Sequence, residues 1–202
     1  MPTPNERGYI DGRRTYSQHG QDLFVIDHLN HRAGGFFIEA GAGDGIFLSN
    51  TYLLEKDYQW TGILVEPDTK NHEKCLRARE CAVENSCLVA QDNGPVKFRE
   101  DDMMGKIDGN GDKIKSVITL SSLLTKFSAP YRIDYLSLDL EGNETEVLMT
   151  FPWDKYTVSI VGIEHNQSYN RYAVQNYLNN YGLIFAGCGD TDDFFVKAGV
   201  NR

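Results

Sequence analysis

The chain has 202 residues, of which 41% are hydrophobic and 24% are charged, as in a typical globular domain. Its formal net charge of −9 at pH 7 argues against a nucleic-acid partner, because a polyanion would be repelled unless the scattered basic residues gathered on one face. No apolar run approaches the roughly 20 residues of a membrane helix, and the polar, proline-bearing opening lacks the features of a secretory signal. We therefore expect a cytoplasmic protein without membrane insertion.

The polar opening predicts a flexible N-terminal segment or linker over 1–15, followed by a single domain over 16–202. A linker-like start also leaves open that the chain is one domain of a larger polypeptide. Its cysteines match neither a metal site nor a redox motif in their spacing, so free thiols in a reducing compartment are expected. They are Cys75, Cys81, Cys87 and Cys188.

From residue 21 onwards, apolar runs of strand length alternate with helical patterns, as in a parallel sheet covered by helices. The first strand runs directly into a glycine-rich turn at 40–45, and Ser49 and Asn50 can cap the helix that follows. In chain order the predicted strands are 36–39, 62–66, 82–89, 133–139, 158–164, 183–186 and 193–197. The predicted helices cover 21–30, a segment around 53–54, a polar stretch ending near 79, 119–124, 142–149 and 169–181.

One stretch, 91–112, interrupts this alternation and is rich in Gly, Asp and Asn. We interpret it as a loop insertion that could carry an edge strand at 96–98. The sequence shows no internal repeat and predicts no second domain.

Every central predicted strand ends in a carboxylate. In an open parallel sheet, ligands bind beyond the carboxyl ends of the strands. A purely structural sheet has no reason to collect acids along one edge, where they repel one another. A functional site is therefore predicted at that edge, around Glu39, Glu66, Asp139 with Glu141, and Glu164 with His165.

The glycine turn allows a ligand to approach the backbone closely, since glycine has no Cβ. It departs from the dinucleotide fingerprint, because the third glycine of that pattern would stand where Ile46 is. A dinucleotide pyrophosphate would also be opposed by the acids, whereas a sulfonium cation would be favoured. An NAD(P)-dependent dehydrogenase is thus disfavoured. Glu66, 23 residues beyond Gly43, stands about where related folds place an acid on ribose hydroxyls.

Several segments together resemble the FkbM family of methyltransferases. They are SQHGQD at 17–22, FIEAGAGDG at 37–45, VEP at 65–67 and LDLEGNE at 138–144, with further similarity at 119–124 and 193–196. The resemblance implies an α/β, Rossmann-like class I methyltransferase fold: a seven-stranded, mostly parallel sheet with helices on both faces and the last strand antiparallel. It also implies S-adenosylmethionine as the cofactor and O-methylation as the reaction.

The same resemblance assigns roles to individual residues. Glu39, Gly41 and Gly43 would hold the methionine part of the cofactor, although an aspartate often stands at the position of Glu39 in the family. Glu66 would hold the ribose, and Asp139 and Glu141 would line the floor near the transferred methyl group. Further assignments are Ser86, Cys87 and Leu88 beside adenine, and Gln18, Gln21 and Asp22 closing over the cofactor.

An acceptor hydroxyl must lose its proton during methyl transfer, so the site needs a general base or a metal ion. The candidate bases are Asp139, Glu141, Glu164 and His165. In a second scheme, Asp139 and Glu164 join His165 or Asn166 to bind Mg²⁺ or a similar cation, since oxygen ligands suit hard cations. Both schemes stay open, with a slight preference for metal or acid assistance.

The acceptor is predicted to be polar, a sugar hydroxyl of a glycan or glycoconjugate, because the segments expected to select it contain few apolar residues. These segments are the leading segment around 17–22, the stretch 91–115 and the stretch 166–172. The aromatic side chains of Tyr169, Tyr172 and Trp153 could form a platform that binds the sugar. Alternatives are a non-sugar, polyketide-type acceptor and a non-catalytic binding module. The chain could also be a domain of a larger glycan-synthesis polypeptide.

Overall fold

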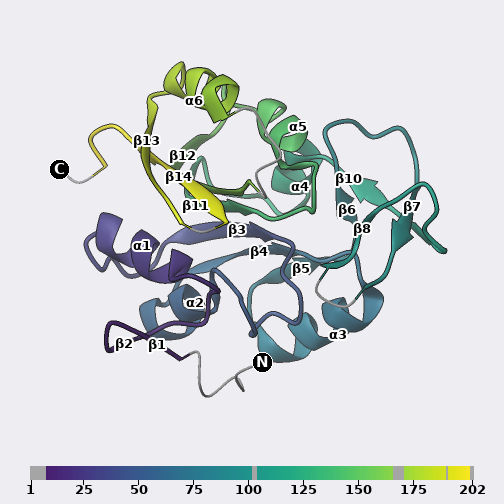
Figure 1. Cartoon of the computed structure of the whole chain (residues 1–202), viewed down its shortest axis with the longest axis horizontal. Coiled ribbons are helices and arrows are strands. Elements are labelled where there is room, and N and C mark those ends of the chain that lie inside the picture. The colour runs from purple at the N-terminus through teal and green to yellow at the C-terminus, as the bar shows by residue number, and fades with distance from the viewer. Residues whose placement is uncertain (1–7, 102–103, 166–170, 190, 201–202) are drawn as a thin grey trace.

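The computed structural model describes residues 8–101, 104–165, 171–189 and 191–200, and a seven-stranded sheet runs through its middle (Figure 1). In spatial order the strands are β13 (Leu183–Cys188), β14 (Asp192–Lys197), β12 (Thr157–Glu164), β11 (Arg132–Leu138), β3 (Phe36–Ala40), β4 (Thr61–Val65) and β5 (Ala82–Glu84).

Five neighbouring strands of this sheet, β12, β11, β3, β4 and β5, run parallel. The last strand, β14, is antiparallel to both of its neighbours, β12 and β13. Its direction follows from its short connection to β13, because a connection of a few residues can join only antiparallel strands. The expected seven-stranded, mostly parallel sheet with an antiparallel last strand is confirmed.

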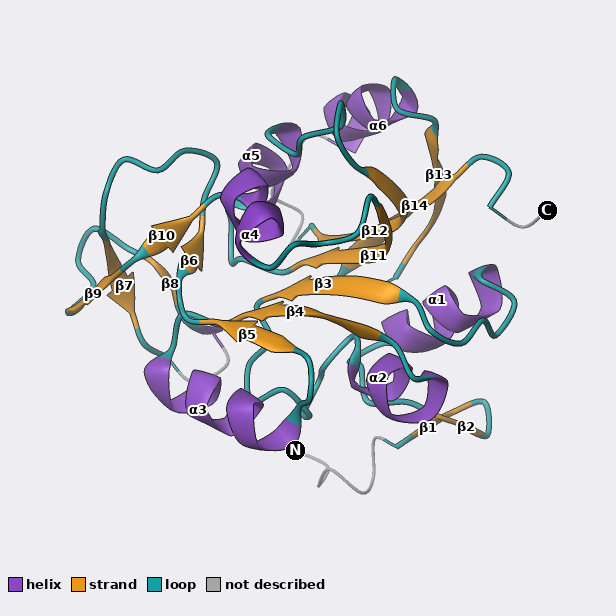
Figure 2. Ribbon diagram, turned by 180° about the vertical axis from the view of Figure 1, so that it is seen from behind, coloured by secondary structure: helices purple, strands orange, loops and turns teal. Residues whose placement is uncertain are grey.

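Helices cover both faces of the sheet, as expected (Figure 2). One face carries α1 (Gln21–His28), α2 (Tyr52–Tyr58) and α3 (Thr69–Ala78), and the other carries α4 (Leu120–Lys126), α5 (Glu144–Met149) and α6 (Arg171–Asn179). Among the described residues, no helix is both long enough and apolar enough to cross a membrane.

The two hydrophobic cores follow from the alternation of side chains along buried strands. On β3, Phe37 packs with the core under α1 and α2, whereas Ile38 packs with the core under α4, α5 and α6. On β4, Leu64 and Ile63 divide in the same way. Continuous apolar runs therefore identify the central strands in the sequence, because both faces of each strand are buried.

The predicted single strand 82–89 is wrong. After β5 the chain leaves the main sheet, and β6 (Cys87–Leu88) pairs instead with β10 (Val117–Ile118) in a separate parallel pair. The side chain of Asn85 causes the break, since its Nδ2 donates to the carbonyl oxygens of Glu66 at 2.8 Å and Pro67 at 3.2 Å. It thereby replaces backbone pairing at the edge of the sheet.

The predicted loop insertion is also corrected. It contains a three-stranded antiparallel sheet in the order β8 (Lys106–Ile107), β7 (Val96–Arg99), β9 (Lys113–Lys115). The expected edge strand at 96–98 is therefore the central strand of a small sheet, anchored by the buried Phe98. We call residues 96–115 the side lobe. Its other two strands, β8 and β9, were missed because they are too short to show an alternating pattern beside the Gly, Asp and Asn of the turns.

The expectation of a flexible segment over 1–15 also changes from residue 8 onwards. There the chain forms a hairpin of β1 (Tyr9–Ile10) and β2 (Arg13–Arg14) rather than a flexible segment. Thr15 is buried behind this hairpin, and its Oγ1 donates to the Asp22 carboxylate at 2.5 Å. The same carboxylate accepts from the Ser17 hydroxyl, so Asp22 fixes the leading segment in place.

Candidate functional site

A cavity of about 270 Å³ lies at the carboxyl ends of the central strands, where the sequence predicts the site. Gly41 follows β3, Glu66 follows β4 and Asp139 follows β11, while Glu164 ends β12, and each of them lines the cavity. The side lobe, the leading segment, the loop before α2, β6 and the start of β14 supply further parts of the walls. The described residues that line it include Gln18, Gln21, Cys87, Leu88, Phe98, Met104, Lys106, Ile107, Glu141, Thr191 and Asp192.

The glycine turn sits directly against the strand beside it. A Cβ on Gly41, whose φ is +85°, would lie 2.0 Å from the backbone oxygen of Asp139, so only glycine fits there. Gly43 donates its backbone N–H to Oε2 of Glu66 at 2.7 Å, and its carbonyl accepts from Sγ of Cys75 at 3.1 Å. The turn is thus fixed from both sides before any ligand arrives.

Glu66 lines the cavity, as expected for a residue that holds a ribose. Its two carboxylate oxygens accept from the backbone N–H groups of Gly43 and Asp68, at 2.7 and 2.8 Å. Burial nevertheless raises the pKa of Glu66 to about 7. Because each carboxylate oxygen carries two lone pairs, Glu66 still has capacity to accept from a ligand hydroxyl.

Glu39 does not line the cavity, although the sequence assigns it to the cofactor. It lies behind the turn, where its carboxylate accepts from the backbone N–H of Asn50 at 2.6 Å, from Oγ of Ser49 at 2.9 Å and from Oγ1 of Thr51. The Arg79 guanidinium lies 3.7 Å away. Glu39 therefore organises the start of α2 and would act on a ligand only through these neighbours.

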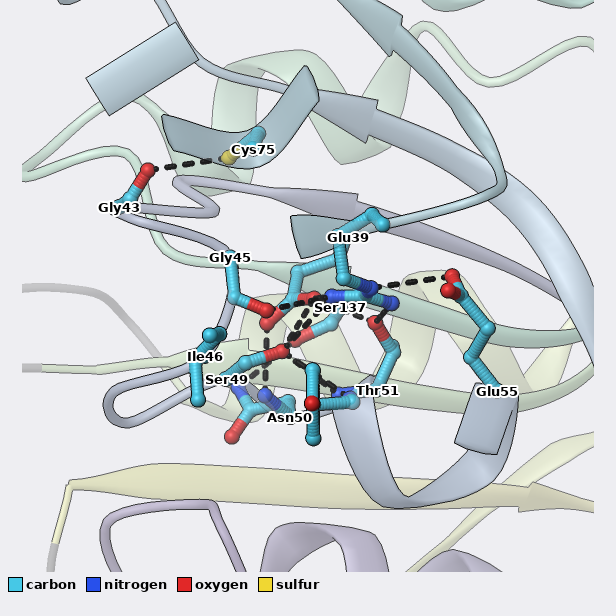
Figure 3. A network of polar contacts seen from close by, with 12 residues as sticks. Glu39, Gly43, Gly45, Ile46, Ser49, Asn50, Thr51, Glu55, Cys75 and Ser137 are labelled. Atoms are coloured by element: carbon cyan, nitrogen blue, oxygen red, sulfur yellow. Dashed lines mark hydrogen bonds and ion pairs between the residues drawn. The ribbon is translucent and has the colours of Figure 1, made fainter. Parts of the chain in front are cut away.

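Arg79 is the centre of this buried network, which Figure 3 shows. Its fully buried side chain donates to Glu55 and to the carbonyl of Gly45, both at 3.0 Å, and to the hydroxyls of Ser49 and Thr51 at 3.2 and 2.9 Å. Burial alone would raise the pKa of Glu55, but Arg79 and hydrogen bonds lower it to about 2. The sequence offered no signal for Arg79, a lone arginine at the end of a polar helix.

Three acids at the floor of the cavity form a second, contrasting cluster, the floor acids Asp139, Glu141 and Glu164. One ligand atom from each lies within 4.8 Å of the others. Burial and the neighbouring Glu164 raise the pKa of Asp139 well above its ordinary value, and burial together with Glu141 raises that of Glu164 to about 7. The pair therefore retains a proton near neutral pH.

Glu141 owes its position to the turn after β11. Oε1 of Glu144 accepts from the backbone N–H groups of Leu140 at 2.8 Å and Gly142 at 2.9 Å. This tight turn holds Glu141 in a left-handed conformation with a φ of 55°. Burial raises the pKa of Glu141, and the nearby Lys106 opposes that shift. Such a strained residue beside a cavity is typical of a functional site.

His165 does not belong to the floor acids. It is buried, its backbone N–H donates to the carbonyl of Thr191 at 2.8 Å, and it does not line the cavity. Successive residues in extended chain point to opposite sides, so Glu164 and His165 cannot both face the same ligand. The group able to hold a metal ion among the described residues is Asp139, Glu141 and Glu164, instead of the predicted set with His165, and Asn166 lies outside the described residues.

The other predicted cofactor residues divide between the cavity and the core. Cys87, Leu88 and Gln18 line the cavity as expected. Gln21 also lines it and donates to Oδ2 of Asp192 at 2.8 Å. Ser86 does not, because its hydroxyl donates to Glu84 at 2.6 Å.

The expected aromatic sugar platform does not form beside the cavity. Trp153 stacks on Tyr181 with ring centroids 4.6 Å apart and donates its Nε1 to the hydroxyl of Tyr177. Tyr172 is 80% exposed, and neither it nor Trp153 lines the cavity. Tyr169 lies outside the described residues.

Residues to which the sequence analysis gave no individual role at the site also line the cavity. Phe98, Met104 and Ile107 come from the side lobe, and Asn50 stands at the start of α2. Among the described residues on its walls, five acids face one cation, Lys106. The walls therefore favour a ligand that carries positive charge, and their apolar parts suit a flat ring.

The comparisons with known proteins agree with this geometry. The family model described as the methyltransferase FkbM domain matches residues 39–191. No curated protein matches the sequence.

Two solved structures resemble the chain in fold. The precorrin-6y C5,15-methyltransferase from Geobacter metallireducens GS-15 has a TM-score of 0.50 at 9% identity, covering 87% of this chain and 87% of that chain. The METTL16 methyltransferase domain has a TM-score of 0.51 at 11% identity, covering 86% of this chain and 64% of that chain. At such identities the likeness shows the fold alone, and this is the class I methyltransferase fold that the sequence predicts.

Proposed function

The chain belongs to the FkbM methyltransferase family, and from that premise we propose that it is an S-adenosylmethionine-dependent O-methyltransferase acting on a sugar hydroxyl of a glycan or glycoconjugate. Binding of the cofactor is supported by the fit of the cavity: a turn where only glycine fits, an acid beside the predicted ribose position and an excess of carboxylates for a sulfonium. When bound, the cofactor supplies an electrophilic methyl group.

The observation that carries the proposal is the convergence of the floor acids within 4.8 Å of one another in the cavity, where burial raises the pKa of the Asp139 and Glu164 pair. Methyl transfer to a hydroxyl needs a group that accepts the proton as the new O–C bond forms and the C–S bond breaks. With a pKa of about 7, Glu164 is ionised in part at neutral pH and can take up that proton. Asp139 shares the site and stabilises the proton after transfer.

A second scheme places a divalent cation among the floor acids, supported by their convergence within 4.8 Å. Carboxylate oxygens suit Mg²⁺, and a bound cation would acidify the acceptor hydroxyl. Activity in EDTA separates the schemes. Full activity in the presence of EDTA would rule out the metal scheme. If EDTA abolishes activity and added Mg²⁺ or Mn²⁺ restores it, the metal scheme replaces the acid scheme.

The acceptor is proposed from polar groups that line the cavity. Glu141, Lys106 and Asn143 can hydrogen-bond several hydroxyls of one sugar. The apolar side chains of Phe98, Met104 and Ile107 favour the second candidate, a non-sugar, polyketide-type acceptor.

Incubation with labelled S-adenosylmethionine and a panel of sugars, glycans and macrolides tests this proposal. We expect label on a glycan oxygen, and a product methylated only on a macrolide would establish the second candidate. Glu164→Gln is the matched variant, since it keeps the shape of the side chain and removes the base. If purified wild-type protein binds S-adenosylhomocysteine but transfers no methyl group to any acceptor, the result favours the alternative of a non-catalytic binding module.

A further inference from the structure

Asn50, the second residue of the pair predicted to cap a helix, carries an unused hydrogen-bond acceptor at the cavity. The residue lines the cavity and is 7% exposed. Its Nδ2 donates to Oγ of Ser137 at 3.0 Å, while its carbonyl Oδ1 has no hydrogen-bond partner among the described residues. Buried side-chain acceptors are nearly always satisfied, so an exception beside a cavity indicates a ligand.

The orientation of Asn50 is fixed at two points. Its backbone N–H donates to Oε1 of Glu39 at 2.6 Å, and Ser137 holds the far side of its amide. Ser137 stands opposite Glu39 in the pairing of β11 with β3, so both anchors come from the centre of the sheet. An amide held in this way loses little freedom when it binds a ligand.

Glu39 is itself held by the network around Arg79. The guanidinium lies 3.7 Å from Glu39 and donates to Ser49 and Thr51, the two residues that flank Asn50. None of these contacts faces the cavity directly. The network therefore reaches the cavity through Asn50, and Glu39 is a positioning residue rather than a residue that contacts the ligand.

The position of Asn50 identifies the part of the ligand that it would meet. Glu66, Cys87 and Leu88 lie at the end of the cavity formed after β4 and β5, which suits a nucleoside. Asn50 lies instead between the ends of β3 and β11, because its anchors Glu39 and Ser137 belong to those strands. A carbonyl oxygen there accepts from an N–H donor, and an ammonium group is the strongest such donor.

We propose that Oδ1 of Asn50 binds the α-ammonium group of the methionine half of the cofactor, with Glu39 acting through Asn50 as its positioning residue. The inference rests on the proposed function, since it takes S-adenosylmethionine as the ligand. It also gives Glu39 a role toward the ligand without placing its carboxylate in the cavity.

Two probes that differ only in the methionine half test the proposal. S-Adenosylhomocysteine contains the amino acid part, and 5′-methylthioadenosine lacks it. Isothermal titration of Asn50→Leu should show S-adenosylhomocysteine binding weakened about 10-fold or more, with 5′-methylthioadenosine unchanged within about 2-fold. Equal weakening of both probes, or of neither, would overturn the proposal.

Asn50→Asp provides the conservative rescue, because it retains an acceptor oxygen toward the ammonium. The ratio of the affinity of Asn50→Asp for S-adenosylhomocysteine to its affinity for 5′-methylthioadenosine should equal or exceed that of the wild type. A loss as large as in Asn50→Leu would mean that the amide nitrogen faces the ligand, and it would refute the assignment of Oδ1. Glu39→Gln should lower the same ratio, with its melting temperature measured alongside.

Asn143→Leu is the matched control, since Asn143 lines the same cavity beside the floor acids. The ratio of its two affinities should equal that of the wild type, and a ratio reduced as in Asn50→Leu would count against a specific contact at Asn50. If wild-type protein binds 5′-methylthioadenosine but discriminates against S-adenosylhomocysteine, this inference alone fails. If it binds neither probe, the proposed function fails with it.

Discussion

The buried network around Arg79 and the floor acids use the same residue types with opposite results. Beneath the glycine turn, Glu55 pairs with Arg79 and its pKa falls to about 2. At the cavity floor, Glu164 faces other acids and its pKa rises to about 7. Of these two buried carboxylates, Glu55 has a fixed cation and belongs to the scaffold, whereas Glu164 has none, keeps a proton near neutral pH and lines the cavity.

The largest effect is expected from breaking the scaffold. Arg79→Leu removes the buried cation that faces both Glu39 and Glu55. Glu39 then keeps only hydrogen bonds, and Lys56 is the one cation left beside Glu55 among the described residues, so the free energy of unfolding should fall by about 3–5 kcal/mol. Urea denaturation followed by circular dichroism measures this change. A loss below about 1 kcal/mol would show that the network is not an ion-paired scaffold and would remove one side of the comparison.

The next effect concerns catalysis at the floor. Glu164→Gln should reduce the rate of methyl transfer about 100-fold, because general-base catalysis typically contributes at least this much. Its unfolding free energy should match or exceed that of the wild type, since a buried acid without a fixed cation contributes no ion pair. Wild-type rates in the variant would assign the proton to another group.

A smaller effect should appear in the pH dependence of stability, and its sign differs between the two regions. Glu55 has a pKa lowered from 4.5 to about 2, so its contribution is present above pH 4.5 and is lost as the pH falls toward 2. Glu164 has a pKa raised from 4.5 to about 7, so its contribution is present below pH 4.5 and is lost as the pH rises through 7.

Denaturation of the wild type and Glu164→Gln between pH 3 and pH 8 separates these contributions. After allowance for solvent screening, Glu164 should account for a decline on the order of 1 kcal/mol between pH 4.5 and pH 7. The variant should therefore show a shallower decline. An identical slope in both proteins would mean that Glu164 titrates normally in the folded state.

The smallest effect is expected at Ser86, a predicted adenine neighbour that points into the core. Ser86→Ala removes a hydroxyl that donates to Glu84, so binding of S-adenosylhomocysteine should change less than about 2-fold. Isothermal titration calorimetry measures this affinity. The comparison is with the neighbouring Cys87, which does line the cavity. A larger loss would place Ser86 in contact with the ligand.

The central strands of the main sheet could be predicted from sequence because they are continuous apolar runs with both faces buried. The acids at the strand ends were also found, since parallel strands deliver their last residues to one edge. Which acid becomes scaffold could not be predicted. That depends on Arg79, which reaches Glu39 from the end of α3, 40 positions further along the chain, and no local pattern records that contact.

Short elements and single polar atoms were also beyond the sequence. In the side lobe only β7 was expected, because β8 and β9 have two and three residues, too few for a period to show. The Asn85 side chain that divides 82–89 acts through backbone carbonyls of another segment. Asn50 looked like an ordinary helix cap. Its proposed role depends on an acceptor that has no partner in the part of the chain that the structure describes, and only the packed structure reveals this.

A crystal structure of the complex with S-adenosylhomocysteine tests the central claim most directly. The account predicts that the ligand sulfur faces the floor acids Asp139 and Glu164, that the ribose lies on Glu66, and that Glu39 and Glu55 touch no ligand atom. A ligand bound elsewhere, or one whose sulfur lies against the Arg79 network instead, would contradict the division between scaffold acids and site acids.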